Sequence, residues 1–235
     1  MKEQMKRIMT ILSERLDKYG FKKKGYNYFV RMADEKTIQN IGFSIATHGE
    51  KHAFYLSPSP GIVYKDVSEL EIQLRNLGVS KYPDYVGAML CSPIGYLMPA
   101  RDYIEWKFML SEDNIAEEVN AMADAIIEYR LPYMEKLVDR DEVVYGMEIG
   151  KYGGAREFVL PILHYLRGNS QRALECINEF IKKFSATSHL EDYEADVLKR
   201  LLGENDRLYE INNNGLKSYL DFADNFKQMM NCHDR

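Results

Sequence analysis

The sequence predicts an α+β protein, with a mainly antiparallel sheet of four or five strands, packed helices and an all-helical C-terminal appendage. Between residues 26 and 110, apolar residues alternate with period two in several runs, which is typical of half-buried strands. From about residue 154 onward they recur at three- and four-residue steps, which is typical of helices, and the strand pattern does not return. We place the α+β domain at residues 1–149 and the helical appendage at 150–235.

An apolar stripe near the N-terminus predicts the first helix. Its members recur at helical spacing and are Met5, Ile8, Met9, Leu12, Leu16 and Tyr19. Gly20 follows, and glycine commonly ends helices because it adopts positive φ without strain. We therefore expect one amphipathic helix that ends before Gly20.

Three runs after Gly20 predict an antiparallel meander, because short polar turns join them. These runs are residues 26–31, 41–46 and 54–56. The segment Ser57-Pro58-Ser59-Pro60-Gly61 is expected to end the third strand, since proline cannot donate to a ladder. A further strand is expected from Tyr103 to Leu110.

The segment 66–78 allows two interpretations. Leu70, Leu74 and Leu77 before Gly78 fit a short helix, whereas Leu70, Ile72 and Leu74 also alternate as they would in a strand. We favour the helix.

Further helices are expected on both sides of the domain boundary. Ser111 is placed to cap a long helix with a buried stripe, and Pro132 must kink that helix or begin a new one. The stripe consists of Ile115, Val119, Met122, Ile126 and Tyr129. A shorter helix is expected over residues 140–149. The appendage is predicted to contain an antiparallel helix pair broken at Gly168-Asn169, then helices near 189–203 and 214–230.

Composition excludes several classes of protein. Of the 235 residues, 46% are hydrophobic and 29% are charged, which fits a soluble globular chain and not a disordered one. No apolar run is long enough for a membrane span, and residues 1–19 lack the pattern of a signal peptide. Cys91, Cys176 and Cys232 show no paired spacing and are interpreted as free thiols in a reducing cytoplasm.

Charge is distributed unevenly along the chain, whose net charge is −5. Residues 1–31 carry a net charge of +6, whereas residues 111–142 carry −7. Such segments are commonly solvated helix faces. The alternative is an acidic face that attracts a basic protein partner by charge complementarity. The candidate contact residues are Glu112, Glu117, Glu118, Asp124 and Glu128. One lysine triplet on an acidic protein is too little for a nucleic-acid surface.

One block of the N-terminal domain has a family resemblance. Gly20-Phe21-Lys22-Lys23-Lys24-Gly25 is followed by Tyr28-Phe29-Val30-Arg31, with weaker support from Ile41-Gly42-Phe43-Ser44 and Trp106. Over about residues 1–149 the chain resembles the small bacterial family designated domain of unknown function 4304. The resemblance implies an α+β fold and brings no activity, catalytic residue or cofactor with it.

No motif for common catalytic chemistry is present. Glycine-rich phosphate loops and the GxSxG elbow are missing. His48 and His52 flank a turn, but a metal there would need at least one further ligand. We therefore expect no metal, nucleotide or covalent cofactor and predict no catalytic residue.

The sequence is compatible with two candidate functions. The first is an uncharacterised cytoplasmic bacterial binding or adaptor protein, of immunity-protein type, that contacts a protein partner and no membrane. The alternative is a hydrolase-type enzyme with a pocket in the 79–106 region. Its candidate lining residues are Tyr82, Tyr96, Tyr103 and Glu105.

Overall fold

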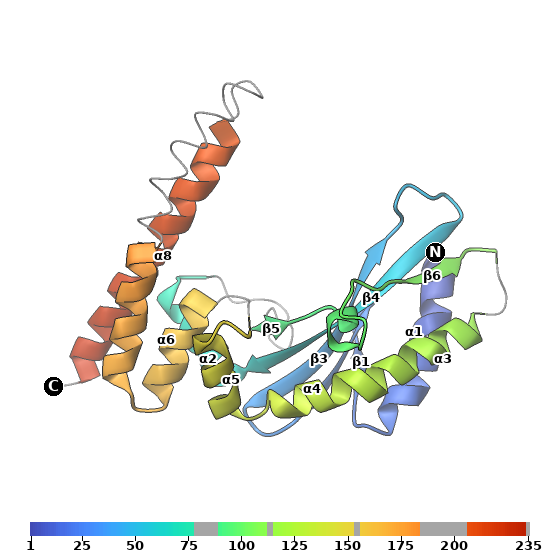
Figure 1. Cartoon of the computed structure of the whole chain (residues 1–235), viewed down its shortest axis with the longest axis horizontal. Coiled ribbons are helices and arrows are strands. Elements are labelled where there is room, and N and C mark those ends of the chain that lie inside the picture. The colour runs from blue at the N-terminus through green and yellow to red at the C-terminus, as the bar shows by residue number, and fades with distance from the viewer. Residues whose placement is uncertain (78–88, 112–114, 153–155, 184–205, 234–235) are drawn as a thin grey trace. The chain divides into compact units, whose positions relative to one another are not determined.

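A computed structural model describes residues 1–77, 89–111, 115–152, 156–183 and 206–233 (Figure 1). The chain forms two compact units. The first comprises Met1–Asp66 with Ser80–Gly154, and the second comprises Val67–Val79 with Ala155–Arg235. The first unit contains the sheet and the second is helical, so the predicted α+β class with C-terminal helices is confirmed.

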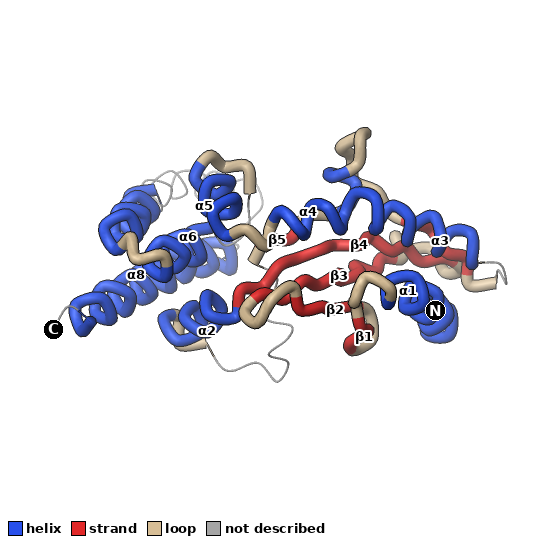
Figure 2. The backbone as a smooth tube through the Cα atoms, turned by 90° about the horizontal axis from the view of Figure 1, so that it is seen from below, coloured by secondary structure: helices blue, strands red, loops and turns tan. Residues whose placement is uncertain are grey.

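Every strand pair in the sheet of the first unit is antiparallel. Figure 2 shows the strands in red, with β1 to β4 in order across the sheet. Its main path follows the chain in the order β1-β2-β3-β4-β5, and β6 also pairs with β4. Because β5 and β6 both pair with β4, at different points along it, the six strands fill five positions. The strands are β1 (Lys22–Lys24), β2 (Tyr28–Met32), β3 (Thr37–Ala46), β4 (Ala53–Tyr64), β5 (Leu90–Cys91) and β6 (Trp106–Met109).

The helices of the first unit include a long one that changes character along its length. Figure 1 shows its three parts, α3, η3 and α4, as one continuous rod in which η3 is π-helical. Pro132 lies in the first turn of α4, directly after η3. A π-helical segment therefore precedes the proline, at the point where a kink or a new helix was predicted. The bounds are α1 (Lys2–Asp17), the 3-10 helix η2 (Ile94–Leu97), α3 (Ala116–Ala125), η3 (Ile126–Arg130), α4 (Leu131–Lys136) and α5 (Arg140–Glu148).

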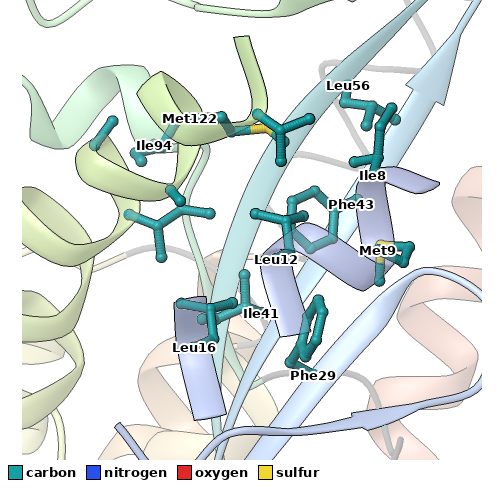
Figure 3. Packing of buried hydrophobic residues seen from close by; sticks show 14 of the residues in the cluster. Ile8, Met9, Leu12, Leu16, Phe29, Ile41, Phe43, Leu56, Ile94 and Met122 are labelled. Atoms are coloured by element: carbon teal, nitrogen blue, oxygen red, sulfur yellow. The ribbon is translucent and has the colours of Figure 1, made fainter. Parts of the chain in front are cut away.

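A hydrophobic core lies between one face of the sheet and α1, η2 and the long helix (Figure 3). From α1, the predicted residues Met5, Ile8, Met9, Leu12 and Leu16 are all fully buried. They pack with Phe29, Phe43 and Leu56 of the sheet and with Met122 of α3. The long helix likewise buries its predicted residues Ile115, Val119, Met122 and Ile126. The last member of each predicted stripe, Tyr19 or Tyr129, is only partly buried and packs against this core.

The proline-rich segment of β4 corrects one prediction. Residues 57–61 do not end the strand, which continues to Tyr64. Pro58 lies opposite Phe43, but its carbonyl points away from β3 and accepts a hydrogen bond from Arg130. In an antiparallel ladder the nitrogen and the carbonyl of one residue lie on the same edge. The missing N–H of Pro58 therefore falls between β5 and β6, where no ladder needs it.

Two element boundaries also differ from prediction. The long helix begins at Ala116 with Ile115 as its N-cap residue, so Ser111 does not cap it. The strand expected from Tyr103 to Leu110 is limited to Trp106–Met109, where the chain pairs with β4. At the ambiguous segment 66–78, Lys65–Leu74 form the favoured helix, α2, and Gly78 lies outside the described residues.

The second unit is built from helices around an aromatic cluster. Its further helices are α6 (Arg156–Leu166), residues 170–183 and α8 (Asp206–His233); the helix expected near 189–203 lies outside the described residues. Phe158 contacts Tyr219 and Phe222 at ring-centroid distances of 5.4 and 5.1 Å. The end of α2 joins this unit, because Asn225 donates to the Leu74 carbonyl across 2.8 Å.

Candidate functional site

The structure joins two of the predicted pocket residues to a histidine. The Tyr103 hydroxyl donates to Glu105 Oε1 across 3.0 Å, and His48 Nε2 lies 2.7 Å from Glu105 Oε2. The Glu105 side chain is 15% exposed and that of His48 is 52% exposed. A largely buried carboxylate therefore holds a solvent-accessible imidazole.

Local backbone geometry brings these residues together. His48 lies in the loop between β3 and β4 and has φ +47°, followed by Gly49 with φ +80°. The imidazole contacts the ring of Tyr55 edge-on, with 4.6 Å between ring centroids. Glu105 immediately precedes β6, and the antiparallel register places Met109, not Glu105, opposite Ala53 at the loop end of β4. The His48 side chain therefore reaches Glu105 by lying against the Tyr55 ring, further along β4.

A second polar group lies next to this one. Lys107 Nζ lies 2.8 Å from Glu50 Oε2, and the Tyr55 hydroxyl donates to the same carboxylate. Hydrogen bonds from Lys107 and Tyr55 lower the pKa of Glu50, and the hydrogen bond to Glu50 raises the pKa of Lys107. At neutral pH both groups therefore stay charged, and neither exchanges protons readily.

The other two pocket residues are not part of this hydrogen-bonded group. Tyr96 lies in η2 and is half exposed, and Tyr82 lies outside the described residues. Burial raises the pKa of Tyr103, and its hydrogen bond to Glu105 acts in the same direction. Tyr103 is therefore a neutral hydrogen-bond donor at physiological pH.

The hydrogen-bonded group of His48, Glu105 and Tyr103 is suited to acid–base chemistry. A carboxylate that binds one nitrogen of an imidazole leaves the other nitrogen available for acid–base work. The sequence pattern linked His48 only to His52, as possible metal ligands, because Glu105 is 57 positions away. Among the described residues, no group of three or more His, Cys, Asp or Glu side chains could hold a metal ion.

The predicted acidic surface is largely present on the long helix. Glu117, Glu118, Asp124 and Glu128 are all exposed, and Glu112 lies outside the described residues. Asp124 forms an ion pair with Arg15 of α1. The other three carboxylates have no ion-pair partner within the described ranges.

The same helix carries a buried arginine that the sequence patterns did not predict. Arg130 is 0% exposed, and its guanidinium donates to the carbonyls of Ser92 and Pro58 across 2.7 and 2.6 Å. Burial lowers its pKa to about 9, so the group keeps its charge at neutral pH. Arg130 forms no ion pair with any described carboxylate, and its Nε has no hydrogen-bond partner there. Its position four residues after the stripe residue Ile126, on the same face of the helix, was the available signal.

Comparisons with known proteins add no identity. No family model matches the chain, and no curated protein or solved structure is significantly similar to it. The resemblance to domain of unknown function 4304 therefore stays a prediction. Within the part of the chain that the structure describes, no helix is both long enough and apolar enough to cross a membrane.

Proposed function

We propose that this protein is a cytoplasmic bacterial binding or adaptor module, of immunity-protein type, that contacts a basic region of a partner protein. The observation that carries the proposal is the set of exposed carboxylates Glu117, Glu118 and Glu128 on α3 and η3, none of which has a described ion-pair partner. We name these three residues the acidic surface.

The rigidity of the helix that carries the acidic surface favours binding. The opposite side of the same helix is fixed in the core by Val119, Met122 and Ile126, which are fully buried. A carboxylate array on a rigid helix loses little backbone entropy when a partner arrives. The field of the acidic surface accelerates encounter with a cationic partner, whereas affinity comes from neighbouring apolar contacts.

A charge-reversal experiment tests the proposal. The triple variant Glu117→Lys, Glu118→Lys, Glu128→Lys is compared with a control of equal charge change, Glu14→Lys, Glu35→Lys, Glu69→Lys. All three control positions are exposed. Proteins captured from bacterial lysate by the wild type should be kept by the control and lost by the first variant. Equal recovery by both variants would contradict the proposal.

A hydrolase-type enzyme is the second candidate, and the His48–Glu105 pair is the observation that favours it. A panel of ester and phosphoester substrates would be assayed with the wild type, His48→Gln and Glu105→Gln. Loss of a measured activity in both variants, with folding unchanged by circular dichroism, would support an acid–base role. Activity that survives both substitutions would reject this role for the pair.

A further inference from the structure

A notch at the outer edge of the sheet is distinct from both candidate surfaces. Strand β1 ends its pairing at Lys22, opposite Val30, whereas β2 continues to Met32. Arg31 and Met32 therefore have a ladder partner on β3 and none on β1. A pocket of about 320 Å³ lies at this step and is lined by Lys22, Lys24, Val30, Met32 and Ile38, among others.

The notch combines an apolar floor with a cationic rim. Val30 and Ile38 are 9% and 3% exposed and pack together, whereas Met32 is 50% exposed. Because side chains alternate along a strand, Lys22 and Lys24 lie on the same face of β1. Their register partners Val30 and Tyr28 place both lysines on the face that carries Val30. An occupant therefore needs an apolar group next to anionic groups.

The cations of the edge differ in how far they are already neutralised. Arg31 forms an ion pair with Glu135 and also donates hydrogen bonds to the Gln39 side chain and the Tyr19 carbonyl. Lys22 is bound to Asp17. Lys23 and Lys24 have no ion-pair partner among the residues described. The positive charge available to a ligand is therefore concentrated at the end of β1.

The backbone of this edge is also available. Strand β1 is the terminal strand of the sheet, and within the described ranges no backbone hydrogen bond reaches its outer side. Three consecutive lysines repel a second copy of the same edge, which protects the protein from self-association. The same charges favour an added strand that carries carboxylates.

We propose that this edge binds an extended acidic peptide segment by strand addition. The peptide pairs its backbone with β1 and places two carboxylates two positions apart. One lies near Lys24, and the other lies near Lys22, where it competes with the exposed Asp17 for that lysine. An apolar side chain two positions further along then enters the notch against Val30 and Met32. The recognised pattern is acidic–x–acidic–x–apolar, and the lysines select it by charge.

A fluorescein-labelled peptide with the sequence Glu-Ser-Glu-Ser-Leu-Ser provides the probe, read by fluorescence anisotropy. Lys24→Glu should weaken binding by about tenfold or more, because it replaces attraction by repulsion. Lys6→Glu is the control: it makes the same charge change at an exposed position of α1 and should alter affinity by less than about twofold. Thermal melts of both variants establish that they fold.

Two further probes separate strand addition from simple ion attraction. A peptide with N-methylated backbone amides keeps the charges but cannot form the ladder, so it should bind at least about tenfold more weakly. N-acetylglutamate amide should fail to compete at equal concentration. Absent binding of the first peptide, equal binding of the methylated one, competition by the single residue or insensitivity to Lys24→Glu would each overturn the proposal.

Discussion

The guanidinium of Arg130 donates to the carbonyl oxygen of Pro58 across 2.6 Å, at the stretch of β4 that lies between β5 and β6. The neighbouring strands leave that part of the β4 edge without a ladder. Arg130 supplies the donor that a strand would otherwise provide, and a second bond to the Ser92 carbonyl fixes the segment after β5. A side chain thus completes the sheet edge.

Replacing Arg130 should destabilise the first unit. Arg130→Met keeps most of the volume but leaves the Pro58 and Ser92 carbonyls without donors, and each such buried group costs about 1–3 kcal/mol. We expect the free energy of unfolding in urea to fall by about 2–5 kcal/mol. The exposed control Arg101→Met should change it by less than about 0.5 kcal/mol. Similar effects of the two substitutions would show that the hydrogen bonds of Arg130 do not stabilise the fold.

Tyr219 and Pro161 should be energetically coupled. Pro161 lies inside α6 and has no N–H for the Glu157 carbonyl, to which the Tyr219 hydroxyl donates instead across 3.3 Å. Tyr219→Phe should therefore cost about 1 kcal/mol of unfolding free energy in the wild type. In a Pro161→Ala background, the restored helical N–H should reduce that cost. A double-mutant cycle measures the coupling, and strictly additive effects would contradict it.

The same tyrosine predicts a dependence of stability on alkaline pH. Burial raises the pKa of Tyr219 above its ordinary value of 10. Because the pKa of Tyr219 is higher in the folded state, the stabilisation by its neutral hydroxyl is complete below pH 10. It is lost as the pH rises above 10, where the hydroxyl ionises in the unfolded state first. The stability advantage of the wild type over Tyr219→Phe should shrink by up to about 1.4 kcal/mol per pH unit above pH 10. A constant difference from pH 8 to 11.5 would refute this reasoning.

Gly146 should resist substitution although it lies within α5. Alanine favours a helix interior over glycine by about 1 kcal/mol, but a Cβ at this position would meet the Tyr152 ring at 2.2 Å. Tyr152 is buried and donates to Glu142 across 2.8 Å, so the ring has little freedom to move. Gly146→Ala should lower the melting temperature of the wild type. In a Tyr152→Leu background, the same change should be neutral or stabilising.

Much of the fold follows from local patterns in the chain. The stripe from Met5 to Leu16 predicted α1, and the positive φ of Gly20, 82°, agrees with the expected stop. Period-two runs predicted the meander of β2, β3 and β4. These features depend on residues only a few positions apart, so they can be predicted from the spacing of apolar residues.

The candidate site was only partly accessible to the same reasoning. Tyr103 and Glu105 were predicted to line a pocket in the 79–106 region, and the structure joins them by a hydrogen bond. Their link to His48 was missed because it depends on how the β3–β4 loop folds against the segment before β6. The acidic residues were visible as a charge run, but the pairing of Asp124 with Arg15 needed the packing of α3 against α1.

Local patterns in the sequence predicted the class of fold and the buried faces of α1 and the long helix, whereas the pairing of β1 with β2 placed the lysines after Gly20 at a sheet edge. Only the tertiary structure decided that β4 continues through Pro58, because the missing N–H lies on an edge that needs no donor. It also decided that Arg130 is buried and that α2 joins the C-terminal helices. Each of these outcomes depends on hydrogen bonds or packing between residues far apart in the chain, which periodicity does not encode.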